Sequence, residues 1–293
     1  MKETFDAEMN RPESNPETQR ALTTDFHSVQ AHYDLSDKFF KLYLDPTMTY
    51  SCAYFPTGKE ALEEAQRAKI DLSLGKLKLE RGERLLDIGC GWGSVVRRAH
   101  EKYGVSVVGL TLSKNQFAYA THFAKEGGLE FRLEGWETYN DRCDKIISIG
   151  AFEHFTPPKY DPFFARCRAL LPPQGALLLH TITTGKPNPT FAFKRWTHFI
   201  LTNIFPGERL PDPEQVITNS RKAGFELLHA ESLRPHYVRT LDLWAENLRH
   251  NRDRAIQLTS EQTFQTYMKY LTSCAEHFRA GDINVYQFLL KSM

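Results

Sequence analysis

A group of glycines beside an aspartate is the clearest chemical signal in the sequence. The run DIGCGWG at residues 87–93 follows a short apolar segment and opens a stretch with helical patterning. Glycines at 89, 91 and 93 allow a tight turn and a close backbone approach to a ligand where a Cβ would collide. The spacing differs from the Gly-x-Gly-x-x-Gly of nicotinamide-binding loops. An acid two residues before the first glycine is typical of loops that bind S-adenosylmethionine, and a dinucleotide is the alternative.

Two further polar residues lie where parallel strands are expected to end. Glu153 stands inside the aromatic run AFEHF, and His180 ends the apolar run GALLLH. A carboxylate flanked by aromatic residues loses its hydration, which is costly unless the group has partners or a chemical role. A hydrogen-bonded structural histidine is the alternative for His180. Since ligands of parallel sheets bind beyond the carboxyl ends of the strands, both residues are candidates for one site.

The elements that position these residues alternate along the chain. Apolar, β-branched segments predict strands, and amphipathic segments between them predict helices. The expected strands are residues 84–89, 105–110, 130–133, 144–149 and 175–182, and the expected helices are residues 95–103, 114–126 and 160–171. Such alternation with short connections predicts an α/β fold with a mostly parallel sheet and helices on both faces.

Three segments lie outside this pattern. Residues 1–24 are expected to be a disordered tail, and residues 25–293 a single domain with two embellishments. Residues 25–79 predict an N-terminal helical cap around a turn at Pro46. Residues 185–233 predict an insertion that carries Phe193, Trp196 and Phe199 at helical spacing. This aromatic stripe predicts either core packing or a lid over an apolar substrate.

Composition excludes several classes of protein. The 293 residues are 41% hydrophobic and carry a formal net charge of +1, which lacks the basic surface that nucleic acid requires. The polar N-terminus does not have the apolar core of a signal peptide, so we expect a cytoplasmic protein. No apolar run reaches the roughly 20 residues of a membrane span, so any membrane contact would be peripheral. Five scattered cysteines predict reduced thiols and no metal site: Cys52, Cys90, Cys143, Cys167 and Cys274.

Six blocks of sequence extend the argument beyond the glycine loop. They are VQAHYDLS at 29–36, TYSCAYF at 49–55, LDIGCGWG at 86–93, GLTLSKNQ at 109–116, SIGAFEHF at 148–155 and RPHY at 234–237. In this order they resemble the mycolic-acid cyclopropane synthases and, more distantly, the bacterial cyclopropane fatty acid synthases, over residues 29–288. The resemblance implies a class I methyltransferase, Rossmann-like fold with a seven-stranded, mostly parallel sheet.

The resemblance also implies which residues bind S-adenosylmethionine. Tyr50 and Ser51 match contacts to its methionine end, and Gly89 and Gly91 match the backbone approach. Further matches are Leu112 and Gln116 at the ribose, Trp136 and Glu137 at the adenine, and Asp87 and Ile149. One feature departs from general methyltransferases, because the strand at 105–110 is followed by Thr-Leu rather than by an acid. Gln116 is the expected substitute at the ribose, and a solvated surface glutamine is the alternative.

The catalytic residues implied by the family surround a bicarbonate ion, and the matching positions are Cys52, Glu153, His180 and Tyr237. Methylation of an alkene displaces a neutral thioether and leaves a carbocation, from which a base must remove a proton without trapping the cation. Bicarbonate is expected to be that base, held by these residues. Aromatic faces stabilise cations by roughly 0.5–2 kcal/mol without attacking them. The candidate substrate-binding residues are Tyr33, Phe152, Trp196, Phe199 and Tyr267.

Three functions remain open at this point. The first is cyclopropanation of a long-chain unsaturated acyl substrate, carried by acyl carrier protein or present in a phospholipid. The second is methylation that leaves a methyl branch, a hydroxyl or a methoxy group on a lipid or a small natural product. The third is a non-catalytic cofactor-binding protein. Gly150 resembles the cyclopropanating branch of the family, whereas oxygenating relatives have glutamate there. Basic residues that could meet an acidic carrier are Lys186, Lys194, Arg195, Arg209, Arg221 and Lys222.

Overall fold

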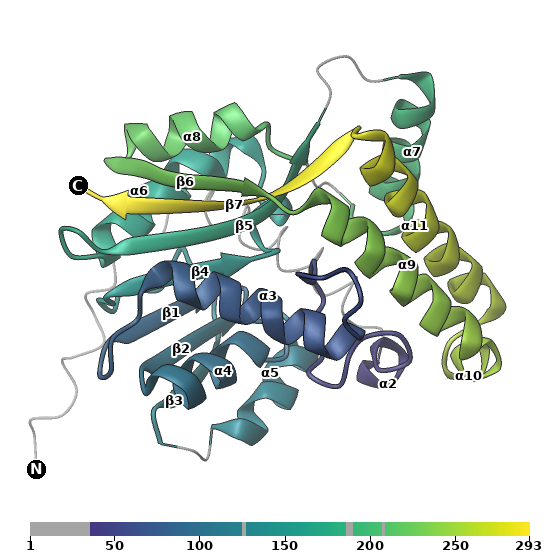
Figure 1. Ribbon diagram of the computed structural model, residues 1–293, viewed down its shortest axis with the longest axis horizontal. Coiled ribbons are helices and arrows are strands. Elements are labelled where there is room, and N and C mark those ends of the chain that lie inside the picture. Colours follow the sequence, from purple (N-terminus) through teal and green to yellow (C-terminus); the bar gives the residue numbers. More distant parts are fainter. Residues whose placement is uncertain (1–35, 125–126, 186–189, 207–208) are drawn as a thin grey trace, which may run out of the picture.

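The computed structural model describes residues 36–124, 127–185, 190–206 and 209–293, and its centre is a seven-stranded sheet (Figure 1). The strands are β1 (Arg84–Ile88), β2 (Ser106–Thr111), β3 (Leu129–Leu133), β4 (Lys145–Ile149), β5 (Ala176–Thr184), β6 (Phe225–Ser232) and β7 (Ile283–Ser292). Their order across the sheet is β3-β2-β1-β4-β5-β7-β6. Strand β7 runs antiparallel to both neighbours, and the other pairs are parallel. The predicted mostly parallel sheet is confirmed.

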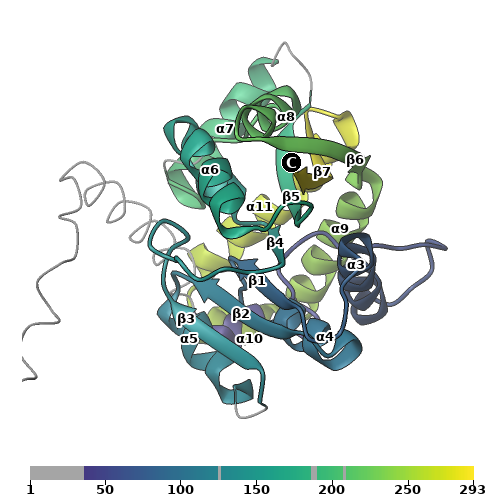
Figure 2. The same cartoon turned by 90° about the vertical axis from the view of Figure 1, so that its left-hand side faces the viewer.

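Continuous apolar strands reflect burial on both faces of the sheet. Leu85 of β1 points into the core formed with α3 (Leu62–Leu77), α4 (Ser94–Tyr103) and α5 (Lys114–Ala120). Its neighbour Leu86 points into the opposite core, which contains α6 (Tyr160–Leu170) and α8 (Pro213–Lys222). Figure 2 shows α3 and α4 on one side of the sheet and α6 and α8 on the other.

A layer of helices lies beyond the carboxyl ends of the parallel strands (Figure 1). It contains α2 (Asp37–Phe40), α7 (Phe191–Asn203), α9 (Arg234–His250), α10 (Arg252–Leu258) and α11 (Glu261–Ala280). These helices share a core of aromatic rings in edge-to-face contact, including Phe39, Tyr43, Trp244 and Tyr267. Offset and edge-to-face ring pairs stabilise such a core beyond the area that they bury. The helical layer therefore closes the end of the sheet where ligands bind.

The sequence boundaries of this layer differ from those predicted. The predicted insertion at 185–233 contains α7, but it also contains α8 and β6, which belong to the sheet and its covering helices. Strand β6 is an edge strand with many exposed side chains, so its apolar pattern is weak. The larger part of the layer, residues 234–280, was not separated from the core by sequence reasoning. The helix predicted at 114–126 ends at Ala120 and is followed by a short 3₁₀ helix, η1 (Thr121–Phe123).

None of the helices in the described ranges is long and apolar enough to cross a bilayer. The described part of the predicted N-terminal cap begins at residue 36 and consists of α2, a turn at Pro46 and α3.

Candidate active site

The glycine loop connects β1 to α4, and its backbone adopts conformations that favour glycine. Gly89, Gly91 and Gly93 have φ values of +83°, +56° and +84°. A Cβ added to Gly89 would lie 2.5 Å from the Cβ of Ala151, whereas a Cβ added to Gly91 would meet no protein atom within 4 Å. Gly89 is therefore required by packing within the protein. Gly91 leaves open space in front of the loop, where a ligand can approach the backbone.

A cavity begins at this loop, and we call it the glycine-loop cavity. Every residue predicted to contact the cofactor lines it. These residues are Tyr50, Ser51, Asp87, Gly89, Gly91, Leu112, Gln116, Trp136, Glu137 and Ile149. They come from the N-terminal segment, the ends of β1 and β4, the segments that follow β1, β2 and β3, and the first turn of α5. The carboxyl ends of adjacent parallel strands bring together all of them except Tyr50 and Ser51.

Gln116 is buried in this cavity rather than solvated on the surface. Its Oε1 accepts a hydrogen bond of 2.8 Å from Thr111 Oγ1, which turns the amide nitrogen away from Thr111. The alternative of a surface glutamine is thereby excluded. A second residue of this wall, Glu137, forms an ion pair of 3.2 Å with Lys159.

Two buried charged groups of opposite sign line the same cavity. Asp87 is 2% exposed, and burial raises the pKa of its carboxyl to about 7. No described residue donates a hydrogen bond to its Oδ2. Lys69 of α3 is 0% exposed, donates to Ser51 Oγ at 2.8 Å, and has its pKa lowered to about 8 by burial.

Sequence reasoning missed Lys69. The signal that could have found it is its position on the buried stripe of α3, between Ala65 and Ser73 at four-residue spacing. A lysine on such a stripe cannot extend into water, so it requires a partner.

A second cavity of about 810 Å³ lies between the sheet and the helical layer, and we call it the interlayer cavity. Its volume is within the range of sites for drug-sized ligands. Its wall is mostly apolar and comes from α7, α9 and α11, with Ile200, Leu241 and Phe278 as examples. All four predicted catalytic residues line it: Cys52, Glu153, His180 and Tyr237.

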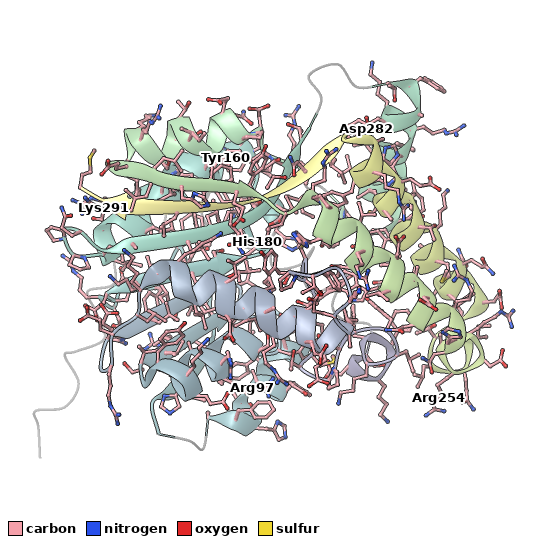
Figure 3. The ribbon with its side chains drawn as sticks, in the orientation of Figure 1. Arg97, Tyr160, His180, Arg254, Asp282 and Lys291 are labelled. Carbon is pink, nitrogen blue, oxygen red and sulfur yellow. The ribbon has the colours of Figure 1, made fainter. Side chains whose placement is uncertain are left out.

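Glu153 and His180 reach the interlayer cavity from neighbouring strands. Glu153 lies in the short 3₁₀ helix η2 (Phe152–His154) after β4, and its Oε1 accepts 2.7 Å from the backbone N–H of Ile182. His180 lies in the middle of β5 rather than after it, because β5 continues four residues further. It pairs with Ile149, the last residue of β4, so it is still level with the carboxyl edge. Figure 3 shows His180 where the sheet meets the helical layer.

A hydrogen-bond chain fixes the tautomer of His180. Lys76 Nζ donates 2.6 Å to Gln287 Oε1, and an ammonium can only donate. Gln287 Nε2 therefore faces Ser73 Oγ at 2.9 Å and His180 Nδ1 at 3.3 Å. Burial lowers the pKa of His180 well below its usual value, and the charges of Lys69 and Lys76 act in the same direction. The imidazole is thus neutral, accepts at Nδ1 and carries its hydrogen on Nε2.

Tyr237 and Cys52 complete the polar group as neutral side chains. Burial raises the pKa of the Tyr237 hydroxyl well above its usual value, and nearby acidic groups, including Cys52 and Glu153, add to the shift. Burial likewise raises the pKa of the Cys52 thiol. The Cys52 Sγ donates to the carbonyls of Ala53 at 3.1 Å and Leu233 at 3.7 Å.

The two cavities share part of their walls. Tyr50, Ser51, Gly150 and His154 line both of them. Gly150 has a φ of +72°, and a Cβ added there would lie 4.0 Å from Ser51 Cβ. A ligand in one cavity can therefore present a group to a ligand in the other at Gly150.

The predicted substrate-contacting aromatic residues divide into three groups. Trp196 lines the interlayer cavity, and its Nε1 donates 3.1 Å to Ser273 Oγ. Phe152, Phe199 and Tyr267 line neither cavity. Phe152 stacks on Tyr160 in the sheet core because the side chains of the η2 turn diverge, so that Glu153 and His154 face the cavity and Phe152 does not. Tyr33 lies outside the described residues.

Phe199 and Tyr267 lie on the sides of their helices that face away from the cavity. The Phe199 ring is 4.1 Å from Lys269 Nζ, and Tyr267 packs on Phe39. The residues of α11 that do line the cavity are Tyr270, Cys274 and Phe278, at four-residue spacing. Their apolar stripe was the signal that sequence reasoning did not use.

Comparisons with known proteins identify the family of the chain. The mycolic acid cyclopropane synthetase family profile matches residues 20–288. The chain belongs to this family. It is 53% identical to cyclopropane mycolic acid synthase MmaA2 of Mycobacterium tuberculosis, over 92% of this chain and 98% of the relative. It is 52% identical to cyclopropane mycolic acid synthase 1 of the same organism, over 91% and 97% of the two chains.

Solved structures extend the likeness to three dimensions. A crystal structure of the cyclopropane synthase CmaA1 in complex with SAH and CTAB has a TM-score of 0.89 and 50% identity, covering 91% of this chain and 98% of that one. Coclaurine N-methyltransferase, at 20% identity and a TM-score of 0.77, shares the fold alone. The predicted family and the class I methyltransferase fold are confirmed, and the chain is an S-adenosylmethionine-dependent methyltransferase.

Proposed function

We propose that this enzyme transfers a methyl carbon from S-adenosylmethionine to a carbon–carbon double bond of a long-chain unsaturated acyl substrate and closes a cyclopropane ring. The observation that carries the proposal is the wall common to the two cavities. The glycine-loop cavity suits the cofactor, and the interlayer cavity, with its volume of about 810 Å³ and apolar wall, suits an acyl chain. The reacting carbons would meet at Gly150.

The reaction requires an environment without water or strong nucleophiles. The two π electrons of the double bond form the new carbon–carbon bond. The carbon–sulfur bond breaks at the same time, and its electron pair leaves with the neutral thioether. The positive charge moves to the substrate carbon. Loss of a proton from the transferred methyl carbon then lets the ring close. Tyr50 at the common wall and Tyr270, whose hydroxyl lies 3.4 Å from that of Tyr50, offer aromatic faces to the cation.

Bicarbonate suits the polar group of the interlayer cavity. When bound, it would supply the base that accepts the proton. The Nε2–H of His180 and the hydroxyl of Tyr237 can donate to an anion, because both side chains are kept neutral by burial. Glu153 can accept from a hydroxyl of the anion, which would keep their charges from repelling each other. Cys52 bounds the same space with a small, protonated thiol.

Methylation without ring closure is the second candidate, and Gly150 favours the first. A side chain at Gly150 would enter the space between the two cavities and would be held in a left-handed backbone conformation. Oxygenating members of the family that this sequence resembles have glutamate at this position. Its side chain would place a polar group beside the reacting carbons. Glycine adds no polar group at this point, which supports ring closure over capture by water.

We further propose that a carrier presents the acyl chain from the side of α7. Phe191, in its first turn, is 80% exposed, and Lys194 and Arg195 are also exposed. Arg209 lines the interlayer cavity, while Lys222 does not line it and pairs with Asp161. Lys186 lies outside the described residues. An acidic acyl carrier protein and an anionic phospholipid surface are the two carriers that suit these charges, and the second would make the membrane contact peripheral.

The test uses unsaturated acyl substrate on each carrier, with mass spectrometry of the product. A gain of 14 daltons with loss of the double bond is expected. A hydroxylated product would contradict ring closure, and an unchanged substrate on both carriers would contradict the substrate class.

The proposed base is tested through Glu153. Glu153→Gln should lower the rate by about 10²–10⁴-fold at ordinary bicarbonate concentration, while binding of S-adenosylhomocysteine changes only a few-fold. The exposed Glu63→Gln is the matched control and should have normal activity. The wild-type enzyme should slow in buffer freed of carbon dioxide and recover when bicarbonate returns. A wild-type rate that is independent of bicarbonate, with no carbonate bound to the purified protein, would refute the base assignment.

A further inference from the structure

Lys69 is a buried charge that the protein does not pair. Its side chain is 0% exposed, and no carboxylate of the described residues lies within ion-pair distance of its Nζ. An ammonium has three hydrogens to donate, and within the described chain only Ser51 Oγ, at 2.8 Å, accepts one. Buried charges in proteins are otherwise paired or bound to a ligand. The position therefore calls for an acceptor from outside the chain.

The surroundings of Lys69 indicate the charge pattern of that ligand. Lys69 and Asp87 line the same cavity and interact electrostatically, but they form no salt bridge in the described structure. Asp87 Oδ2 also lacks a partner among the described residues. The cavity thus presents one positive and one negative group at the end of β1. A zwitterion with a carboxylate and an ammonium is complementary to both.

We propose that Lys69 binds the carboxylate of the methionine moiety of S-adenosylmethionine, and that Asp87 balances the ammonium of the same moiety. The proposal rests on the placement of the cofactor in the glycine-loop cavity. Ser51, predicted to contact the methionine end, is held by Lys69, so its hydroxyl hydrogen is free to point at the same carboxylate. Lysine and serine together form a two-donor site.

This role has a specific kinetic signature. The methionine carboxylate does not change during methyl transfer, so its contact with Lys69 is the same in the ground state and the transition state. Loss of such uniform binding raises KM and leaves kcat nearly unchanged. A purely structural role would instead lower the stability of the protein and affect all ligands of the cavity alike.

The experiment compares two ligands on three forms of the protein. S-adenosylhomocysteine carries the carboxylate and the ammonium, and 5′-methylthioadenosine lacks both. In Lys69→Met, S-adenosylhomocysteine should bind about 10- to 100-fold more weakly, since a hydrogen bond between charged groups is lost. Binding of 5′-methylthioadenosine should change less than about threefold. Lys76→Met, seven residues along the same helix and outside the glycine-loop cavity, should leave the affinity ratio of the two ligands unchanged.

The effect of replacing Lys69 by methionine can also be measured on the stability of the ligand-free protein. Because Lys69→Met removes an unpaired buried ammonium, the melting temperature of the ligand-free protein should stay the same or rise. Equal loss of both ligands, or an unchanged affinity for S-adenosylhomocysteine in a folded variant, would overturn the proposal. Should Lys69→Met fail to fold, decarboxylated S-adenosylhomocysteine is tested on the wild-type protein. Binding within threefold of S-adenosylhomocysteine would then overturn it.

A further variant separates failure of this inference from failure of the proposed cofactor site. A Cβ at Gly91 would enter the ligand space without touching the protein, so Gly91→Ala should weaken both ligands. If Gly91→Ala weakens binding of both ligands while Lys69→Met weakens neither, the cofactor site is supported and the proposed role of Lys69 is refuted. If Gly91→Ala binds both normally, the cofactor does not occupy this cavity.

Discussion

At the scale of single residues, the charges buried in the glycine-loop cavity link cofactor binding to pH. The carboxyl of Asp87 has a pKa raised to about 7 by burial, so a proton remains on a fraction of the ligand-free molecules near neutrality. A bound ammonium favours the ionised carboxylate and lowers this pKa. Binding below pH 7 must therefore release a proton, and the affinity falls as the pH falls through about 7.

The prediction is that the Kd of S-adenosylhomocysteine rises by up to tenfold for each pH unit between about 7 and 5. Calorimetry in two buffers of different ionisation enthalpy would detect the released proton at pH 6. Asp87→Asn cannot titrate, so its weaker binding should not vary over this range. A wild-type affinity that is constant from pH 5 to 8 would contradict the interaction of Asp87 with the ammonium.

Residue-scale prediction from sequence selected residues that share one cavity where a motif fixed both the residue and its backbone. The residues predicted to contact the cofactor all line one cavity, and all of them except Tyr50 and Ser51 lie at or shortly after the carboxyl ends of strands. It did less well with isolated aromatic residues. Phe152 and Glu153 are adjacent in sequence, yet they point to opposite sides of η2. Which of two neighbours faces a cavity depends on the turn geometry, which the sequence pattern does not determine.

At the scale of elements, α7 is the helix that tests the predicted lid. Trp196 faces the interlayer cavity, and Phe199, three residues further on, packs under the ammonium of Lys269 instead. Both side chains are only partly buried. The two aromatics are thus a matched pair on one helix, and they differ in whether they face the cavity.

Trp196→Ala should raise KM for a long-chain substrate at least about fivefold, because the ring covers part of the apolar wall. Phe199→Ala should leave KM within about twofold. Each variant should cost less stability than the roughly 3–5 kcal/mol of a fully buried aromatic residue. Steady-state kinetics and thermal melting measure both effects. Equal KM values for the two variants would indicate that the aromatic residues of α7 serve core packing alone.

Element boundaries could be predicted in the sheet but not in the helical layer. The strands around the glycine loop have continuous apolar sequences bounded by glycine or by charged residues, which mark their ends clearly. Strand β6 is half exposed, and α9 and α11 are amphipathic helices whose apolar stripes do not indicate which partner they bury. Their pairing depends on contacts between residues far apart in sequence, so the extent of the insertion could not be predicted.

At the scale of the whole molecule, the path of the chain ties the helical layer to the sheet. Helices α9, α10 and α11 stand between β6 and β7 in the sequence, yet β7 lies between β5 and β6 in the sheet. Unfolding these helices would therefore disturb β7, which is an interior strand of the sheet. Tyr50 and Ser51 also line the glycine-loop cavity. They lie in the segment that joins α2 of the helical layer to α3, which covers one face of the sheet. We therefore expect the described chain to unfold as a single cooperative unit.

Differential scanning calorimetry tests this expectation and the cofactor site together. The ligand-free protein should show one transition whose calorimetric and van't Hoff enthalpies agree. S-adenosylhomocysteine at 100 times its Kd stabilises the folded state by about 2.7 kcal/mol, which should move the whole transition up by about 4–5 °C. If the helical layer were an independent domain, the ligand would split the profile and shift only the part that contains the glycine loop. Since β7 is hydrogen-bonded to both β5 and β6, a layer that melts first would take β7 with it and destroy the order of the sheet. Two separated transitions, with the lower one insensitive to ligand, would refute the single-domain expectation.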